Sequence, residues 1–174
     1  MAVKREDIIF ESENIYYVKV SESLIEDYLK MVNDINVAKL ISKNIRTYTY
    51  EDELEWVNSK LEENAIVFSM LEKGSGNFIG NIELMNNNGH SAELGISITS
   101  EMQNKHYGLE GIKALINHGF NKLHLDEINL IVFSSNKKAI KCYENAGFNE
   151  YKVVKDVAVI DGENVDDICM KIKK

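Results

Sequence analysis

The spacing of apolar and polar residues divides the chain into short strands and amphipathic helices. A β-branched and aromatic run over residues 15–20 predicts a first strand. Apolar residues then recur every three or four positions over 24–32 and, after a candidate N-cap at Thr49, over 54–61. The first third of the chain is therefore expected to hold one strand followed by two helices.

The middle of the chain predicts an antiparallel meander. Three strand-like segments at 65–71, 77–85 and 91–99 are joined by turn sequences rich in glycine, serine and asparagine. Residues 107–123 follow with apolar positions at helical spacing. We therefore expect a long helix directly after the third strand of the meander.

The last third predicts a buried strand at 128–133, a short helix at 136–146 and a closing hairpin of strands 148–160 and 165–172. Asp161-Gly162 supplies the turn of that hairpin. The expected order is β-α-α-β-β-β-α-β-α-β-β. This order places the chain in the α/β (α+β) class.

Composition favours one ordinary globular unit. The 174 residues are 44% hydrophobic and 28% charged, and they include no proline. No repeat, low-complexity tract or Gly/Ser linker divides the chain, so we expect a single domain over 1–174. The longest apolar runs are strand-sized and the first ten residues lack an apolar signal core, which predicts no membrane segment and a cytoplasmic location.

The charge balance disfavours a nucleic-acid partner. Lysine and arginine number 20 against 28 aspartate and glutamate residues, which gives a net charge of -8. The same charge would attract a polycationic small molecule, although many proteins are acidic for solubility alone. Cys142 and Cys169 lie far apart and the four histidines lack ligand spacing beside carboxylates, so we expect neither a disulfide nor a metal site.

The first segment that suggests chemistry is Gln-Asn-Lys-His-Tyr-Gly at 103–108, between a predicted strand and a predicted helix. Free backbone N–H groups and the helix dipole at such a junction favour an anion, and a pyrophosphate would fit. A plain flexible turn explains the same residues when they are considered alone.

The second segment has the pattern N-x-x-A-x-x-x-Y-x-x-x-G-F, from Asn136 to Phe148. Asn136 and Tyr143 are seven residues apart and therefore share one helix face. Gly147 can end the helix in a left-handed conformation, with Phe148 packing back onto it. The alternative is an ordinary packed helix in which Asn136 is only an N-cap.

In this order, the two segments resemble the GNAT superfamily of acyl-CoA-dependent N-acetyltransferases. The resemblance covers nearly the whole chain and is strongest to the branch of ribosomal-protein N-terminal, spermidine and amino-sugar acetyltransferases. It implies a single GNAT-like domain whose central, mostly antiparallel mixed sheet is flanked by helices and splayed at the cofactor site. It also implies acetyl-CoA as co-substrate and an amine acceptor such as a polyamine, a protein N-terminus or an amino sugar, and it allows a homodimer.

In that family a Q/R-x-x-G-x-G/A loop binds the pyrophosphate through backbone amides, and Gln103, Tyr107 and Gly108 match the pattern. His106 stands where the family usually has glycine. Its side chain could crowd the phosphates, demand a different backbone angle or add a donor to the anion. Lys105, in the same loop, is also expected to bind the cofactor.

The resemblance further implies that Asn136 hydrogen-bonds the pantetheine arm and that the backbone of Leu94, Ile96 and Ile98 holds that arm like an added strand. Tyr143 would lie near the sulfur of CoA, where its phenol can protonate the departing thiolate. The alternative role for Tyr143 is that of a packed helix residue.

The acceptor must also lose a proton, because an alkylamine with a pKa near ~10.4 is only about one part in a thousand neutral at pH 7. Glu93 matches the position where many GNAT enzymes carry a base carboxylate, and alternation places it on one strand face with Gly95 and Ser97. Glu83 on the neighbouring strand is a second candidate. Both could instead be ordinary solvated carboxylates, with a water chain as the base.

The favoured function is direct transfer of acetyl from acetyl-CoA to a primary amine in a ternary complex. Cys142 points about 100° away from Tyr143 around the helix, which argues against a covalent intermediate on its thiol. A catalytically silent acyl-CoA-binding regulatory module is the alternative that His106 keeps open. A Rossmann domain is disfavoured because no G-x-G-x-x-G follows the first strand.

Overall fold

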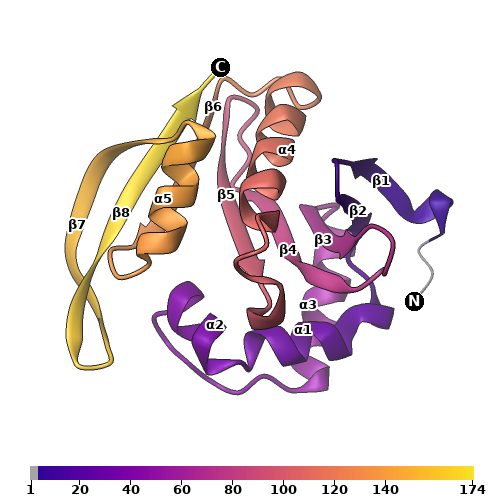
Figure 1. Cartoon of the computed structure of the whole chain (residues 1–174), viewed down its shortest axis with the longest axis horizontal. Coiled ribbons are helices and arrows are strands. Elements are labelled where there is room, and N and C mark those ends of the chain that lie inside the picture. The colour runs from indigo at the N-terminus through magenta and orange to yellow at the C-terminus, as the bar shows by residue number, and fades with distance from the viewer. Residues whose placement is uncertain (1–3) are drawn as a thin grey trace.

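The computed structural model describes residues 4–174, which form one mixed sheet of eight strands flanked by five α-helices (Figure 1). The strand order is β1-β2-β3-β4-β5-β6-β8-β7. The strands are β1 (Ile8–Glu11), β2 (Ile15–Lys19), β3 (Ile66–Glu72), β4 (Phe78–Met85), β5 (Ser91–Ile98), β6 (Glu127–Phe133), β7 (Asn149–Ile160) and β8 (Glu163–Lys173). The predicted mixed, mostly antiparallel sheet is confirmed, since β5–β6 is its one parallel pair among these strands.

The predicted meander corresponds to β3, β4 and β5, which pair in antiparallel register. The strand predicted at 15–20 is β2, and it pairs with β3. The edge strand β1 was not predicted. It has only four residues, alternately half-buried and exposed, so its sequence carries little of the signal that longer strands show.

Helices α1 (Ile25–Val32), α2 (Ile35–Ile41) and α3 (Tyr50–Glu62) fill the segment between β2 and β3. The predicted apolar face of α1 is confirmed, because Ile25, Tyr28 and Met31 are buried. The two-turn helix α2 was not predicted. Its Asp34 N-cap accepts a hydrogen bond from the Asn36 backbone N–H, which gives this short helix a defined start.

Thr49 begins α3 as predicted, within a capping box in which its side chain and that of Asp52 bond each other's backbone N–H groups. The predicted apolar stripe at 54–61 is only partly right. Val57 is buried, but Leu61 is 46% exposed. The buried face of α3 instead runs through Val57 and Glu53, because the helix packs with its other flank against α1.

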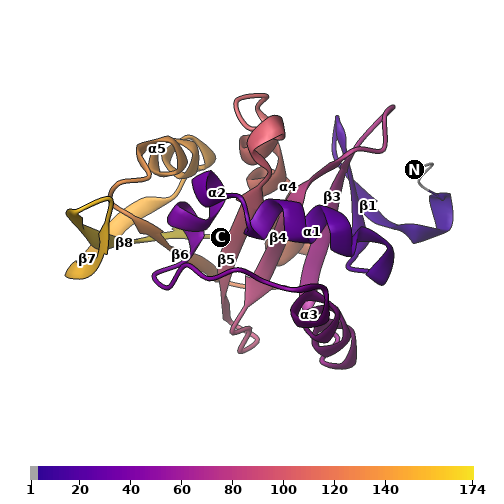
Figure 2. The same ribbon diagram turned by 90° about the horizontal axis from the view of Figure 1, so that it is seen from below.

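Helices α4 (Tyr107–Asn121) and α5 (Lys137–Ala146) confirm the two predicted C-terminal helices. Figure 1 shows both lying across one face of the sheet, with α1 and α2 along its lower edge, and Figure 2 shows α3 on the opposite side from α4 and α5. The apolar core is accordingly divided into two clusters, one containing residues of α4 and the other residues of α1 and α3. None of the helices within 4–174 is long and apolar enough to cross a membrane.

The sheet opens between β5 and β6. These two parallel strands are paired only over Ser91–Glu93 of β5 and Glu127–Asn129 of β6, and beyond this point they diverge. The rest of β5 remains paired with β4 on its other side, and the rest of β6 with β8. The predicted splay is therefore present, and the edge of β5 from Leu94 onward is left without a strand partner.

Candidate active site

A cavity of about 1310 Å³ occupies the opening between β5 and β6 and extends past both faces of the sheet. All the predicted site residues except one line it: Glu93, Leu94, Ile96, Ile98, Gln103, His106, Tyr107, Gly108, Asn136 and Tyr143. Its far wall is formed by residues of α2, the segment after α2, and β8. The residues that the sequence singled out are thus brought together in one place.

The segment before α4 presents a series of free backbone donors. Within residues 4–174, no hydrogen bond engages the N–H groups of 104–109, and the first bonded N–H of the helix is that of Glu110. Asn104 and His106 both have positive φ angles, 61° and 68°. Left-handed residues in a loop of this kind turn neighbouring N–H groups toward one side, and such a concave arrangement binds anions.

His106 has the backbone conformation expected of the glycine that usually stands at this position in the GNAT pattern. Its backbone is left-handed, with φ 68° and ψ 0°, so the loop retains a conformation that glycine adopts most readily. The side chain is exposed and lines the cavity. The histidine therefore leaves the backbone path in place and adds an imidazole at the mouth.

Two loop side chains hold the junction in shape rather than facing an anion. The Gln103 amide donates to the Ile98 carbonyl at 3.0 Å, which fixes the end of β5 against the loop. The Tyr107 hydroxyl donates to Glu72, and this hydrogen bond raises the pKa of Tyr107 to about 12. Lys105, which was predicted to bind the cofactor, does not line the cavity, and its ammonium group lies 3.5 Å from the Met102 sulfur.

Three lysines at the start of α5 were not anticipated. Lys137, Lys138 and Lys141 line the cavity, and the Lys138 ammonium group donates to the Asn104 side chain at 3.3 Å, across the gap between α5 and the loop. These exposed charges place a basic patch beside the free N–H groups, although the chain as a whole carries a net charge of -8. The patch could not be predicted from the net charge, because these lysines come close to the loop only when the chain is folded.

Helix α5 has the glycine end that was predicted for it, and Asn136 has the N-cap role that the alternative interpretation gave it. The Asn136 side-chain oxygen accepts from the Ala139 N–H at 3.2 Å, so Asn136 is the N-cap of the helix, and its amide NH₂ group remains available to the cavity. Gly147 ends the helix with φ 103°. The Phe148 N–H then bonds the Tyr143 carbonyl at 3.0 Å, and the two rings pack edge to face at 5.9 Å.

Tyr143 is 6% exposed, and it lines the cavity. Burial raises the pKa of its phenol above the ordinary value, and the neighbouring Cys142 adds to the shift. The phenol is consequently protonated at neutral pH, which is the form that can donate a proton. Burial also raises the pKa of the half-buried Cys142 thiol, so it is not poised as a nucleophile.

The two candidate base carboxylates lie on the face of the sheet opposite α4. Glu93 accepts a weak hydrogen bond from Asn86 at 3.4 Å. Glu83 forms an ion pair with Lys60 at 3.4 Å and stretches across Gly95, whose missing side chain leaves room for it. Because Glu83 already has a cationic partner, Glu93 is the freer of the two to accept a proton.

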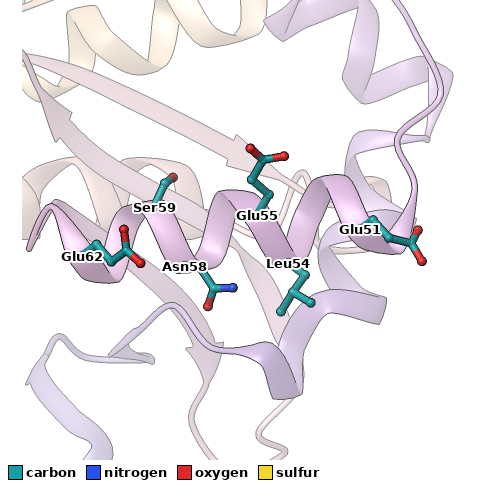
Figure 3. Close-up of a pocket in the computed structure, with 6 residues that line it drawn as sticks. All are labelled: Glu51, Leu54, Glu55, Asn58, Ser59 and Glu62. Atoms are coloured by element: carbon teal, nitrogen blue, oxygen red, sulfur yellow. The ribbon is translucent and has the colours of Figure 1, made fainter.

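A smaller hollow of about 420 Å³ lies along α3, and Figure 3 shows the six side chains that line it, all from this one helix. Three of them are glutamates: Glu51, Glu55 and Glu62. None of the predicted site residues borders this hollow. The predicted site residues therefore lie at the splay between β5 and β6 and not along α3.

The fold and the splayed site define a class of protein. The acetyltransferase (GNAT) domain model matches residues 15–149, which include the meander, the loop before α4 and the motif on α5. The chain belongs to the GNAT acetyltransferase family.

Individual relatives resemble this chain over different lengths. The uncharacterised N-acetyltransferase YnaD of Bacillus subtilis is 31% identical over 97 residues, which cover 55% of this chain and 56% of YnaD. The L-amino acid N-acetyltransferase AaaT of Escherichia coli is 35% identical over 77 residues, which cover 44% of this chain and 48% of AaaT. The chain thus spans about half the length of these two relatives.

A solved structure resembles this chain over more of its length than these two relatives do. The crystal structure of spermidine N-acetyltransferase from Vibrio cholerae, in complex with CoA and spermine, superposes with a TM-score of 0.85 at 25% identity. The superposition covers 93% of this chain and 96% of that protein.

Proposed function

We propose that this GNAT domain transfers the acetyl group of acetyl-CoA to a primary amine by direct attack within a ternary complex. The observation that carries the proposal is the opening of the sheet after Glu93, where the free edge of β5, the loop residues 104 and 106–109 and Tyr143 line one cavity. A similar fold holds CoA and spermine in the Vibrio cholerae enzyme. The residues present fit such a cofactor.

The cofactor would be held along the helix face of the splay. The N–H groups of 104–109 would bind the pyrophosphate, with Lys137 and Lys138 supplying charge beside it. The unpaired edge of β5 over 94–98 would hold the pantetheine arm as an added strand, with the Asn136 amide as a further donor.

Acetyl-CoA, when bound, supplies an activated acyl carbon and a thiolate leaving group. Glu93 would take the proton from the incoming ammonium group, because it faces the cavity from the side of the sheet away from α4. Tyr143 would donate its phenolic proton to the sulfur as the thioester breaks, because α5 lies on the opposite face and its phenol is protonated. Base and acid would then act on the reacting atoms from the two sides of the opening.

The first test is binding. Acetyl-CoA is expected to raise the melting temperature of the purified protein, with a dissociation constant on the order of 100 μM or tighter, because the donor-lined loop exists only in the folded state. A melting temperature that does not change at millimolar acetyl-CoA would remove the functional part of the proposal.

The second test separates an enzyme from a silent binder of acyl-CoA. Release of free thiol from acetyl-CoA would be followed with polyamines, N-terminal peptides, amino sugars, amino acids and aminoglycosides as acceptors. Turnover with any of them supports the transferase. Binding of acetyl-CoA with no turnover across the panel would instead favour the regulatory module.

A further inference from the structure

Ile131 is a half-exposed apolar side chain in the part of the cavity that contains the proposed base. Glu93 pairs with Asn129 of β6, and Ile131 lies two residues further along that strand, so all three share one face of the sheet. On this face the cavity reaches Met85 of β4, which is paired with Glu93. Ile131 is 50% exposed and lines the same cavity. The sheet therefore offers an apolar surface beside the base.

Helix α2 supplies a second apolar surface to the cavity. Val37, Leu40 and Ile41 line it, and their spacing of three and four residues places them on one side of the helix. The helix packs against β5 and β6, the two strands that border the opening. Ile41, at the end of the helix, is 46% exposed. An apolar group that lay against Ile41 and Ile131 would remove water from both side chains, and such burial is favourable.

The charged groups around the cavity leave one carboxylate for a cationic ligand. Glu83 is paired with Lys60 at 3.4 Å, and Asp167 is paired with Lys43 at 2.8 Å. Both carboxylates belong to residues that line the cavity, and so does Glu93. Among residues 4–174, no lysine or arginine pairs with Glu93. The cavity is thus matched to a ligand with a single positive charge.

We propose that the acceptor is an apolar monoamine, in which the reacting primary amine is the only charge and is carried by an alkyl or aryl body, and that Ile131 selects it by contacting that body. This inference rests on the proposed function of the same cavity. With the amine at Glu93, the body extends along β6 toward Ile131, whose level on the strand is about 7 Å further on. Ile131 is then a specificity-determining residue.

Two other classes of amine are disfavoured by the same surroundings. The second ammonium group of a diamine would lie among apolar side chains, because the remaining carboxylates already have lysine partners, and burying an unpaired charge is costly. The carboxylate of an amino acid would compete with Asp167 for Lys43. The net charge of -8 attracts polycations to the molecule in general, but it does not provide a partner for a second ammonium group inside the cavity.

The informative variant is Ile131→Gln, which keeps the length of the side chain and places an amide in the apolar surface. Its oxygen can accept from a second ammonium group and its NH₂ group can donate to a carboxylate. Ile131→Leu keeps the surface apolar. The matched control is Ile9→Gln, because Ile9 is also a strand isoleucine, 46% exposed on β1, but does not line the cavity.

The probes are hexylamine, 1,6-diaminohexane and 6-aminohexanoate, which share the length of the carbon chain and differ at the far end. With acetyl-CoA, the wild-type protein is expected to use hexylamine with a kcat/KM tenfold or more above that of the other two, measured by release of free thiol. Ile131→Gln should reduce this preference to less than about threefold without changing the KM for acetyl-CoA. Ile131→Leu and Ile9→Gln should retain it.

Binding of the same probes to the protein saturated with CoA, measured by calorimetry, keeps the two proposals apart and decides the preference where no thiol is released. A preference for hexylamine that disappears in Ile131→Gln then supports the inference, and only the transferase proposal fails. Turnover that favours the diamine or the aminohexanoate would keep the transferase and overturn the inference. A wild-type protein without the preference, or an Ile131→Gln protein that retains it, would also overturn the inference.

Discussion

His106 offers a direct test of how the loop before α4 binds an anion. Its left-handed backbone costs a residue with a side chain about 1 to 2 kcal/mol, whereas glycine adopts it freely. Glycine also gains freedom in the unfolded chain, which offsets about 0.5 to 1 kcal/mol of the benefit. His106→Gly is therefore expected to raise the free energy of unfolding by about 0.5 to 1 kcal/mol, or the melting temperature by about 1 to 4 °C for a chain of this length.

The control is His124→Gly. His124 is likewise exposed and left-handed, with φ 56°, but it lies at the other end of α4, away from the cavity. The two variants should gain similar stability in thermal unfolding of the protein without ligand. A clear loss of stability in His106→Gly alone would show that the imidazole makes a stabilising contact.

The affinity for CoA then shows whether the backbone N–H groups or the imidazole of His106 bind the pyrophosphate. If the N–H groups of 104–109 hold the pyrophosphate, His106→Gly should leave the dissociation constant within a few-fold. His106→Val should weaken binding tenfold or more, because a β-branched residue resists the left-handed conformation and would move the loop. Equal tenfold losses in both variants, measured by calorimetry, would instead assign binding to the imidazole and refute the backbone argument.

Three further predictions concern the chemistry and the scaffold. Tyr143→Phe should lower kcat roughly 100-fold or more while leaving CoA affinity and melting temperature nearly unchanged, and a variant retaining half of the wild-type kcat would remove the general-acid role. Glu93→Gln should lower kcat/KM for the acceptor at least about tenfold at pH 7, with a smaller loss at high pH, where the amine is already neutral. Glu110→Gln should lower the free energy of unfolding by about 1 to 2 kcal/mol, because the Glu110 carboxylate accepts hydrogen bonds from Ser12 and Asn14. Burial by itself would raise the pKa of Glu110, but the hydrogen bonds from Ser12 and Asn14 together lower it. The ionised Glu110 therefore contributes fully to the free energy of unfolding above the unfolded-state pKa near ~4.3. The difference in melting temperature between the wild type and Glu110→Gln should shrink as pH falls below about 4.

The elements that could be predicted from the sequence are those whose signals are local. Thr49 caps α3 and Gly147 ends α5 because the geometry of each depends on residues within one turn of it. Strand β1 and helix α2 could not be predicted, because both are short and held by distant partners. The turn after β1 is bound by Glu110 of α4, and α2 is tied to the β7–β8 turn by the ion pair of Lys39 with Asp161.

The site residues also fall into those with a local signal in the sequence and those that only the fold brings together. Tyr143 and Asn136 were found because they belong to one motif on one helix, and the structure places them in the cavity as that motif implies. The ion pair of Asp167 with Lys43 joins residues 124 positions apart, and no spacing in the sequence relates them. The basic patch on α5 was hidden for a similar reason, since Lys138 meets Asn104 only across the folded gap.

Two sets of polar groups that the fold leaves unpaired lie at one place in the molecule. The backbone N–H groups of 104 and 106–109 and the edge of β5 beyond Glu93 border the same opening in the sheet. Backbone groups without a partner in the fold are free to bind a ligand. The two sets also differ in kind, because only donors lie before and at the start of α4, whereas the strand edge offers donors and acceptors in alternation. Their order matches a ligand with anionic groups at one end and an amide-bearing arm beside the strand, which supports the proposed acyl-CoA site.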